Sequence, residues 1–511
     1  MRERMPWRLP PWWAVPLRWM VVPSRRWAAR WRWVVPSLWL AAPSCWIAAP
    51  PAAAVGWSAP RSLGTCPSAA APQIAFPSSS PSTPTGPGAI LWLEGLSCGA
   101  GRPALAVAPL DHDDRPGVPE RVALDGASAL LANGATLGRV AVTALARRRA
   151  LVLQGNAAHG LEAAAGLRAP AGVFAATRAY LGDVAVASVQ PGPSIAVYVE
   201  RWFSPRFSRF VRIPIGAGRV TALTVTMDYR SDVLVAWQQR GAIYAHVLRS
   251  HGRREPTQRV GPSAPGPQLQ ALVSDDDHGM IAWSSSRARA QTSVYLSLST
   301  RGVRFPKRRL LASFADPAGV ARQPGSLALV RLASENVMLA WSEVRHGHGV
   351  VLAAPAVFAG VRKATRLTPP DGQSALAALA PGAANEAIAL WREAEPSWGR
   401  ARLWAARTYI EHRGRVGFSL PELLAPAGTA RDPVLAVDPG DDRALAVWLR
   451  PGGTVVYALG PSPTGYRRRK FTLPAVPGHA GAHRLRILGA VVLAVALSLG
   501  TGALLLRRRA R

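Results

Sequence analysis

Six arginines occupy a similar position in a repeating sequence pattern, in or beside the short segment that follows an apolar run ending near tryptophan. They are Arg240, Arg287, Arg289, Arg345, Arg392 and Arg450. If the repeats surround one axis, these segments lie on one side and the fields of the side chains add. The pattern predicts a basic face that binds polyanions, with an affinity that falls with ionic strength, because exposed charges are screened over about 8 Å at physiological salt. Other arginines, among them Arg253, Arg254, Arg467, Arg468 and Arg469, leave diffuse basicity as the alternative.

The carboxylates fall elsewhere in the repeat. A glycosidase needs a nucleophile and an acid/base carboxylate. Nearly all the candidates lie in the turn between the first and second strands: Asp228, Asp232, Asp275, Asp276, Asp277, Glu335, Glu386, Asp438, Asp441 and Asp442. Aspartate is common in turns because its side chain hydrogen-bonds the backbone just ahead. We therefore predict turn-forming roles for these residues and assign none to catalysis. Glu343, Glu393 and Glu395 are exceptions, since they lie among the arginine-bearing segments.

Signals for metals, cofactors and nucleophiles are weak. His346 and His348 are two residues apart, but no cysteine, third histidine or carboxylate cluster completes a zinc site. Residues 275–277 lack the ligand spacing of a calcium loop. No Gly-x-Ser-x-Gly elbow, Walker loop or dinucleotide fingerprint stands where a strand-helix unit could use it. The sequence predicts no metal site and no cofactor, and it favours a binding protein over an enzyme.

A repeat organises these residues. Five apolar runs end in Trp237, Trp283, Trp341, Trp391 and Trp448, with spacings of 46, 58, 50 and 57 residues. Each run follows an alternating strand and a polar turn, and two further short strands come after it. Alternation with a period of two, divided by Gly, Pro and Asp, indicates antiparallel sheet, and helical periodicity is absent. Four strands per repeat are typical of propeller blades, in which the tryptophans would fill the space between neighbouring sheets.

Weaker copies extend the array toward the N-terminus. Residues 183–188 align with residues 232–237, and residues 90–93 fit a first strand of this kind, whereas the copy in residues 128–168 is degenerate. Residues 56–63 match residues 417–424, which predicts an N-terminal outer strand that completes the last blade and removes an exposed edge. The predicted fold class is all-β, a seven- or eight-bladed β-propeller.

One arrangement of strands resembles a known family. A strand ending in Ala-Val-Trp is followed by a second hairpin and then by a Gly-aromatic-x-x-Pro strand, such as residues 417–421. The repeat resembles the sialidase-like and related bacterial extracellular β-propellers over most of residues 56–476. The catalytic motifs of that family are not matched, because residues 274–283 have the letters of its Asp-box at a different spacing. Residues 210–214 resemble its Arg-Ile-Pro segment, but they fall where an outer strand is expected. A sialidase-like glycoside hydrolase with degenerate motifs is the alternative function.

The two ends of the chain have the composition of targeting segments. Residues 1–54 combine a basic stretch with an apolar run ending in three alanines, which predicts a signal peptide. Residues 487–506 are uncharged and would form a helix about 30 Å long, enough to span a bilayer. The arginines in the tail, residues 507–511, predict a cytoplasmic C-terminus. The expected order is signal peptide 1–54, extracellular propeller 55–476, linker 477–486, membrane helix 487–506 and tail. Attachment by a sortase is an alternative, although residues 473–477 depart from the Leu-Pro-x-Thr-Gly motif that this enzyme needs.

The charge balance agrees with a polyanionic environment. Lys and Arg number 61 against 29 acidic residues, a net charge of +32, which favours anionic lipid headgroups, acidic glycans or nucleic acid as surroundings. Arginine-biased coding is the competing explanation. Cys66 and Cys98 are expected to form a disulfide outside the cell. The sequence predicts a single-pass membrane protein whose propeller binds a glycan, a cell-wall polymer or a protein, with no specific nucleic-acid partner.

Overall fold

The computed structural model describes residues between 56 and 460. Within that span the description leaves out residues 68–69, 77–87, 96–102, 112, 137–138, 157–159, 170–171, 179–182, 201–208, 253–254, 265, 275–277, 288–290, 300–303, 307, 333–335, 358–359, 370–371, 383–385, 396–397, 411–415 and 439–442. The described chain is almost entirely β-strand, with two 3₁₀ helices, η3 (Val320–Arg322) and η5 (Trp398–Arg400).

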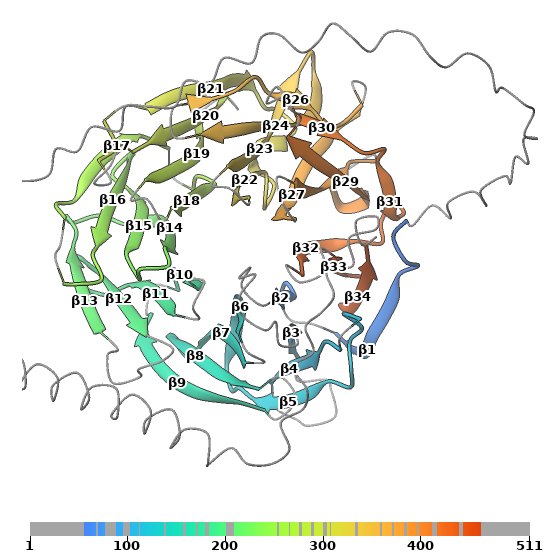
Figure 1. The fold of residues 1–511 in the computed structure, drawn as a ribbon, viewed down its shortest axis with the longest axis horizontal. Coiled ribbons are helices and arrows are strands. Elements are labelled where there is room, and N and C mark those ends of the chain that lie inside the picture. The colour runs from blue at the N-terminus through green and yellow to red at the C-terminus, as the bar shows by residue number, and fades with distance from the viewer. Residues whose placement is uncertain are drawn as a thin grey trace, which may run out of the picture. The chain divides into compact units, whose positions relative to one another are not determined.

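The strands form blades around a ring, and in each blade the chain runs from the inner strand outward (Figure 1). Blade 1 contains β2 (Gln73–Ala75), β3 (Ala89–Glu94), β4 (Ala104–Pro109) and β5 (Glu120–Ala123). Blade 2 contains β6 (Ala127–Thr136), β7 (Arg139–Ala146), β8 (Arg149–Asn156) and β9 (Gly160–Arg168). Blade 3 contains β10 (Phe174–Arg178), β11 (Val184–Val189), β12 (Ser194–Glu200) and β13 (Arg209–Pro214). Blade 4 contains β14 (Val220–Met227), β15 (Val233–Gln239), β16 (Ala242–Leu248) and β17 (Gln258–Pro262).

The second half of the ring repeats this order, with the outer strand divided in blades 6 and 7. Blade 5 contains β18 (Leu269–Val273), β19 (Gly279–Arg287), β20 (Gln291–Leu298) and β21 (Arg308–Ala315). Blade 6 contains β22 (Leu327–Arg331), β23 (Val337–Arg345), β24 (His348–Val357), β25 (Gly360–Val361) and β26 (Thr365–Arg366). Blade 7 contains β27 (Ser374–Pro381), β28 (Glu386–Glu393), β29 (Arg402–Ile410), β30 (Val416–Phe418) and β31 (Glu422–Ala425). Blade 8 contains β32 (Arg431–Val437), β33 (Ala444–Leu449), β34 (Thr454–Leu459) and β1 (Arg61–Pro67).

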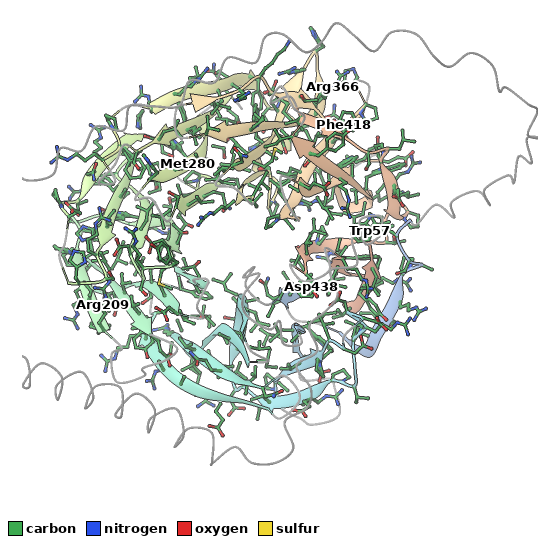
Figure 2. The ribbon with its side chains drawn as sticks, in the orientation of Figure 1. Trp57, Arg209, Met280, Arg366, Phe418 and Asp438 are labelled. Carbon is green, nitrogen blue, oxygen red and sulfur yellow. The ribbon has the colours of Figure 1, made fainter. Side chains whose placement is uncertain are left out.

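The N-terminal strand closes the ring. β1 pairs antiparallel with β34 as the outer strand of blade 8, which confirms the role predicted for residues 56–63. Next to this pairing, the backbone N–H of Ser58 donates to the Leu459 carbonyl at 2.7 Å. The backbone N–H of Trp57 donates to the Glu422 carboxylate of blade 7 at 3.1 Å, and Figure 2 labels Trp57 at this junction. The described strands therefore form eight blades in a closed ring. The prediction of an all-β propeller with seven or eight blades is confirmed, and the number of blades is eight.

Tryptophans pack the seams between blades. Six of them, each on a second strand, have exposed fractions of 4% or less: Trp92, Trp237, Trp283, Trp341, Trp391 and Trp448. Each shares an apolar cluster with the preceding blade, as Trp283 of blade 5 does with Leu234 and Ile243 of blade 4. The indole N–H of Trp283 also donates to the Pro262 carbonyl of blade 4 at 3.1 Å. The prediction that these rings fill the space between neighbouring sheets is confirmed.

Strand direction gives the ring two faces. Neighbouring strands of a blade are antiparallel, and each outer strand leads directly to the next inner strand, so all inner strands run the same way. We call the side with the turns between second and third strands and the links between blades the upper face. The lower face carries the turns between first and second strands and the loops between third and fourth strands. The repeat therefore places equivalent turns of all blades on one side.

The predicted targeting segments lie outside the described residues. These are the signal peptide 1–54 and the segments 477–486, 487–506 and 507–511. Among the residues that the structure describes, none of the helices is long and apolar enough to cross a membrane. Membrane attachment and cellular location therefore stay predictions.

Candidate binding face

The upper-face turns hold basic residues in an unfavourable backbone conformation. Positive φ angles occur at Arg147 and Arg148 (45° and 62°), at Arg240 (50°) and at His346 (51°). Both central residues of a two-residue type I′ hairpin turn need positive φ, and Asn-Gly is the preferred pair. A left-handed conformation costs a residue with a side chain roughly 1–2 kcal/mol. Three blades thus place a basic side chain on the upper face despite this cost.

Arg240 lies at the tip of the β15–β16 hairpin in blade 4 and is exposed. Its guanidinium rests on the link from blade 3, since a Cβ added at Gly216 would lie 3.1 Å from the Nη1 atom of Arg240. The Gln239 side chain holds the same link, donating to the carbonyls of Gly216 and Gly218 at 2.6 and 2.8 Å. Within the described part of the chain, Arg240 forms no ion pair. Its charge is therefore available to a ligand.

Arg345 lies at the end of β23 in blade 6 and is already paired. Its Nε donates to the carboxylate of Glu343 on the same strand, and its side chain is 48% exposed. The other oxygen of that carboxylate accepts the indole N–H of Trp341 at 2.9 Å. Glu343, an exception in the sequence pattern, therefore bridges the tryptophan of the blade core and the arginine of the turn.

Arg392, on β28 of blade 7, faces its neighbour in the ring. Its Nη2 donates to the Pro324 carbonyl, in the link between blades 5 and 6, at 2.8 Å. Its Nε atom is buried without a hydrogen-bond partner among the described residues. Burial lowers the pKa of the Arg392 guanidinium below its usual value, and the charge of Asp432 partly offsets this effect. Arg392 therefore connects blade 7 to the link between blades 5 and 6.

Other predicted site residues are placed only in part. Arg450 lies in the β33–β34 turn of blade 8, exposed and without an ion pair to the described residues. Arg287 ends β19 of blade 5, but its side chain is outside the description, and Arg289 lies outside it altogether. Cys66 belongs to β1, its side chain also outside the description, and Cys98 is not described, so the disulfide stays a prediction.

The placed arginines do not form one pocket. Arg240, Arg345, Arg392 and Arg450 belong to four different blades, all on the upper face. Their turns connect the middle strands of the blades, whereas the inner strands lie nearest the ring axis. The upper-face arginines thus form separate basic points over the blades.

Sequence reasoning missed one basic cluster. Arg147, Arg148 and Arg149 occupy the β7–β8 turn of blade 2, and all three are exposed. Arg147 forms an ion pair of 3.0 Å with Asp125, in the link from blade 1. The run of three arginines between two alternating apolar strands could have identified this turn, but the blade has no tryptophan to mark its second strand.

On the lower face, Asp228 confirms the prediction of turn chemistry, whereas Asp232 and Glu386 form ion pairs with arginines. Asp228 accepts hydrogen bonds from the backbone N–H groups of Arg230 and Asp232, at 3.0 and 2.8 Å. Asp232 forms a buried ion pair of 2.8 Å with Arg249, in the loop between the third and fourth strands. Glu386 similarly pairs with Arg407 at 2.9 Å. These carboxylates hold turns and loops together; Asp275, Asp276, Asp277, Glu335, Asp441 and Asp442 lie outside the described residues.

The inner strands offer little acid–base chemistry. Among the eight described inner strands, Asp432 at the start of β32 is the one acidic residue. A glycosidase of the kind considered above needs two carboxylates within about 5–10 Å of each other, and these inner strands supply no such pair. The described residues also contain no group of three or more His, Cys, Asp or Glu side chains placed to hold a metal ion.

Comparisons with known proteins extend no further than the fold. No protein-family profile matches the chain, and no curated protein matches it. Similar solved structures include the polysaccharide lyase Uly1, at 10% identity over 64% of this chain and 88% of that one, with a TM-score of 0.39. They also include SapL1 lectin with α-methyl fucoside (11%; 60% and 98%; 0.34) and Aleuria aurantia lectin with α-methyl-L-fucoside (12%; 59% and 95%; 0.32). Similarities this distant do not indicate which ligand this chain binds or whether it has an activity. They also do not support the narrower resemblance to sialidases. The fold-level resemblance to propellers stands on the blade topology, which is that of an eight-bladed β-propeller.

Proposed function

We propose that this propeller is a binding module for acidic polymers, such as acidic glycans or cell-wall polymers, and that its upper face takes the ligand. The proposal rests on arginines of the upper face that are exposed and have no ion-pair partner among the described residues. Arg148, Arg240 and Arg450 are exposed and form no ion pair with any described residue. Guanidinium groups bind carboxylate, sulfate and phosphate oxygens well because their donors form a planar fork.

The lower face contrasts with this arrangement. Three of its described aspartates are buried, with exposed fractions of 1% for Asp183, 2% for Asp228 and 4% for Asp232. Hydrogen bonds and the ion pair to Arg249 engage these carboxylates. The carboxylates of these lower-face turns are therefore engaged, whereas Arg148, Arg240 and Arg450 on the upper face form no ion pair with the described residues.

Salt-dependent binding tests the location of the site. The variant Arg240→Gln/Arg345→Gln/Arg450→Gln removes three upper-face charges. We expect it to bind an acidic polysaccharide, polygalacturonate, about tenfold more weakly at low salt, because the summed field at one face is reduced. Binding of the full-length chain, purified in a mild detergent, would be measured across a salt series.

The matched control removes three charges from the outer strands. Arg259, Arg309 and Arg366 are exposed there, and Figure 2 labels Arg366 at the rim of the ring. Changing these three to glutamine alters the net charge equally, and we expect a loss of about twofold or less. Equal losses in the two variants would show that the protein has a generally cationic surface, and polymer binding would then not define a site.

Membrane attachment through residues 487–506 is part of the proposal and fits the route of the chain. β34 runs toward the lower face and ends beside Ser58, which donates to and accepts from the backbone of Leu459. The described chain thus both begins and ends at the lower face. A tether at that side would leave the upper face open to ligands. Protease added to intact cells should remove the propeller and spare a C-terminal tag; loss of the tag would contradict the orientation.

A further inference from the structure

We propose that blade 2 carries a subsite for one uronate unit of an acidic polysaccharide, in a hollow between Asp125, Arg147 and Arg149. This inference rests on the proposed function and adds the place and chemical class of one contact. The hollow has a volume of about 310 Å³ and opens where the link from blade 1 meets the β7–β8 turn. Its lining consists of Ala123, Leu124, Asp125, Ala146, Arg147, Arg149 and Leu151.

The first wall of the hollow is Arg147, which the link from blade 1 holds in place. Its Nη2 atom is 3.0 Å from the Oδ2 atom of Asp125. Its aliphatic part lies on Gly126, where an added Cβ would come within 3.0 Å of the Arg147 Cγ atom. Gly126 also has a φ of 69°, so a larger residue would be both strained and in close contact. The Arg147 guanidinium is thus directed toward Asp125 by a surface ion pair, with 72% of its side chain exposed.

The opposite wall is Arg149, which lies across the outer strand of the same blade. A Cβ added at Gly166 on β9 would lie 3.4 Å from the Nη2 atom of Arg149 and 3.1 Å from the Cδ2 atom of Leu151. Arg149 forms no ion pair with the described residues, so its charge is not compensated there. The hollow therefore has one paired and one unpaired guanidinium, and the Leu151 side chain is part of its lining.

These groups select a ligand by its chemistry. An anionic group suits the two guanidinium ions, which bind carboxylates in a bidentate geometry. The Asp125 carboxylate accepts hydrogen bonds and repels a second anion, so it favours hydroxyl groups beside the first contact. Leu124 and Leu151 offer an apolar surface. A uronate unit combines one carboxylate, neighbouring hydroxyls and an apolar ring face, whereas a neutral sugar would leave the arginines unused and a densely sulfated or phosphorylated unit would oppose Asp125.

The turn itself supports a binding role. Arg147 and Arg148 both adopt positive φ, at 45° and 62°, without a glycine at either position. Backbone strain of this kind costs about 1–3 kcal/mol per residue and is concentrated at functional sites. In blade 4 the equivalent turn keeps a glycine, Gly241, at its second position. Blade 2 thus combines the more strained basic turn with a lined hollow.

The test measures binding of a galacturonate hexamer to the full-length chain by calorimetry. We expect Arg147→Gln/Arg149→Gln to weaken binding by about tenfold or more, since charge-assisted bidentate contacts are lost. The matched variant Arg259→Gln/Arg309→Gln removes the same charge from the outer strands, and we expect a change of about twofold or less. Equal losses from the two variants would overturn the subsite, whereas the salt series with polygalacturonate tests the proposed function separately.

Two further variants remove the subsite without removing positive charge. Ala123 is exposed, and Ala123→Trp should fill the hollow, abolishing hexamer binding while binding to polyglutamate changes little. Asp125→Ala should reduce the preference for the uronate hexamer over polyglutamate of equal charge, because the acceptor for hydroxyls is lost. A non-specific basic patch predicts the opposite for Asp125→Ala, tighter binding of both ligands. Tighter binding of both ligands by Asp125→Ala would overturn the subsite. So would unchanged hexamer binding by Ala123→Trp, or no hexamer binding by the unaltered protein. If the unaltered protein binds no acidic polymer at all, the proposed function is overturned as well.

Discussion

Blades 2 and 4 make the same two-residue turn between their second and third strands, but they fill the space beneath it differently. In blade 4, Trp237 stands three residues before the turn and pairs across the strands with Tyr244, with the rings stacked at 5.8 Å between centroids. In blade 2, the equivalent pair is Ala144 and Leu151. The aromatic pair of one blade is thus a small aliphatic pair in the other.

The difference separates two uses of one repeat. Trp237 is 1% exposed and joins the apolar cluster between blades 3 and 4, so its hairpin belongs to the core. Leu151 is only partly buried, and it lines the hollow beneath the arginine-rich turn. The subsite that we propose thus lies in a repeat that lacks the tryptophan found on the second strand of six other blades.

The largest expected effect tests the core side of this comparison. Trp237→Ala should lower the free energy of unfolding by about 3–5 kcal/mol, because it leaves a cavity in the seam between two blades. Ala144→Gly, at the equivalent position of blade 2, should cost about 1 kcal/mol or less. Denaturant titration of the full-length chain measures both. A similar cost for the two changes would mean that the tryptophan seam does not dominate the stability of the ring.

A pair of milder variants, one in each of two neighbouring seams, separates the effect of side-chain volume from that of hydrogen bonding. The indole N–H of Trp237 has no hydrogen-bond partner among the described residues, whereas that of Trp283 donates to the Pro262 carbonyl. Changing Trp283 to phenylalanine should therefore cost about 1 kcal/mol more than the same change at Trp237.

The parts of the fold that the sequence predicted are those with strong local signals. The buried tryptophan strands, the closing strand at residues 56–63 and the turn aspartates Asp228 and Asp232 each combine a distinctive residue with a recurring place in the repeat. Second strands such as β15 and β33 are buried along their whole length, and a continuous apolar run is the pattern expected for such a strand. Strong patterns of this kind also fixed the outer-strand assignment of residues 210–214.

The parts that were missed depend on contacts between repeats. The second strand of blade 2 has no tryptophan, and its turn has no glycine, so neither usual marker identified Arg147 and Arg148. The hollow beside them needs Leu124 and Asp125 from the link after blade 1, which no local pattern could place next to that turn. The contact between Arg392 and Pro324 likewise joins a strand of blade 7 to the link between blades 5 and 6. Periodicity reveals what the repeats share, and the subsite that we propose depends on residues that one repeat does not share with the others.

The smallest expected effect tests the strain in the turn. Arg148→Gly should raise the free energy of unfolding by about 1 kcal/mol, because glycine adopts a φ of 62° without the steric penalty of a side chain. The reverse change in blade 4, Gly241→Arg, should lower it by a similar amount. Space is not the obstacle at Gly241, since the nearest atom to an added Cβ, the Ser263 carbonyl oxygen, is 3.7 Å away.

The binding consequence of Arg148→Gly follows from its place in the turn. Arg148 does not line the hollow, whereas its neighbours Arg147 and Arg149 do. The variant should therefore be more stable and bind the uronate hexamer within about twofold of the unaltered protein, because one exposed charge beside the contact contributes little. If the variant gains stability but loses binding more than tenfold, Arg148 itself contacts the ligand and the hollow is too narrow a description of the site. If its stability does not change, the positive φ at this turn is not a source of strain, and the support that the turn lends to a binding role in blade 2 falls away.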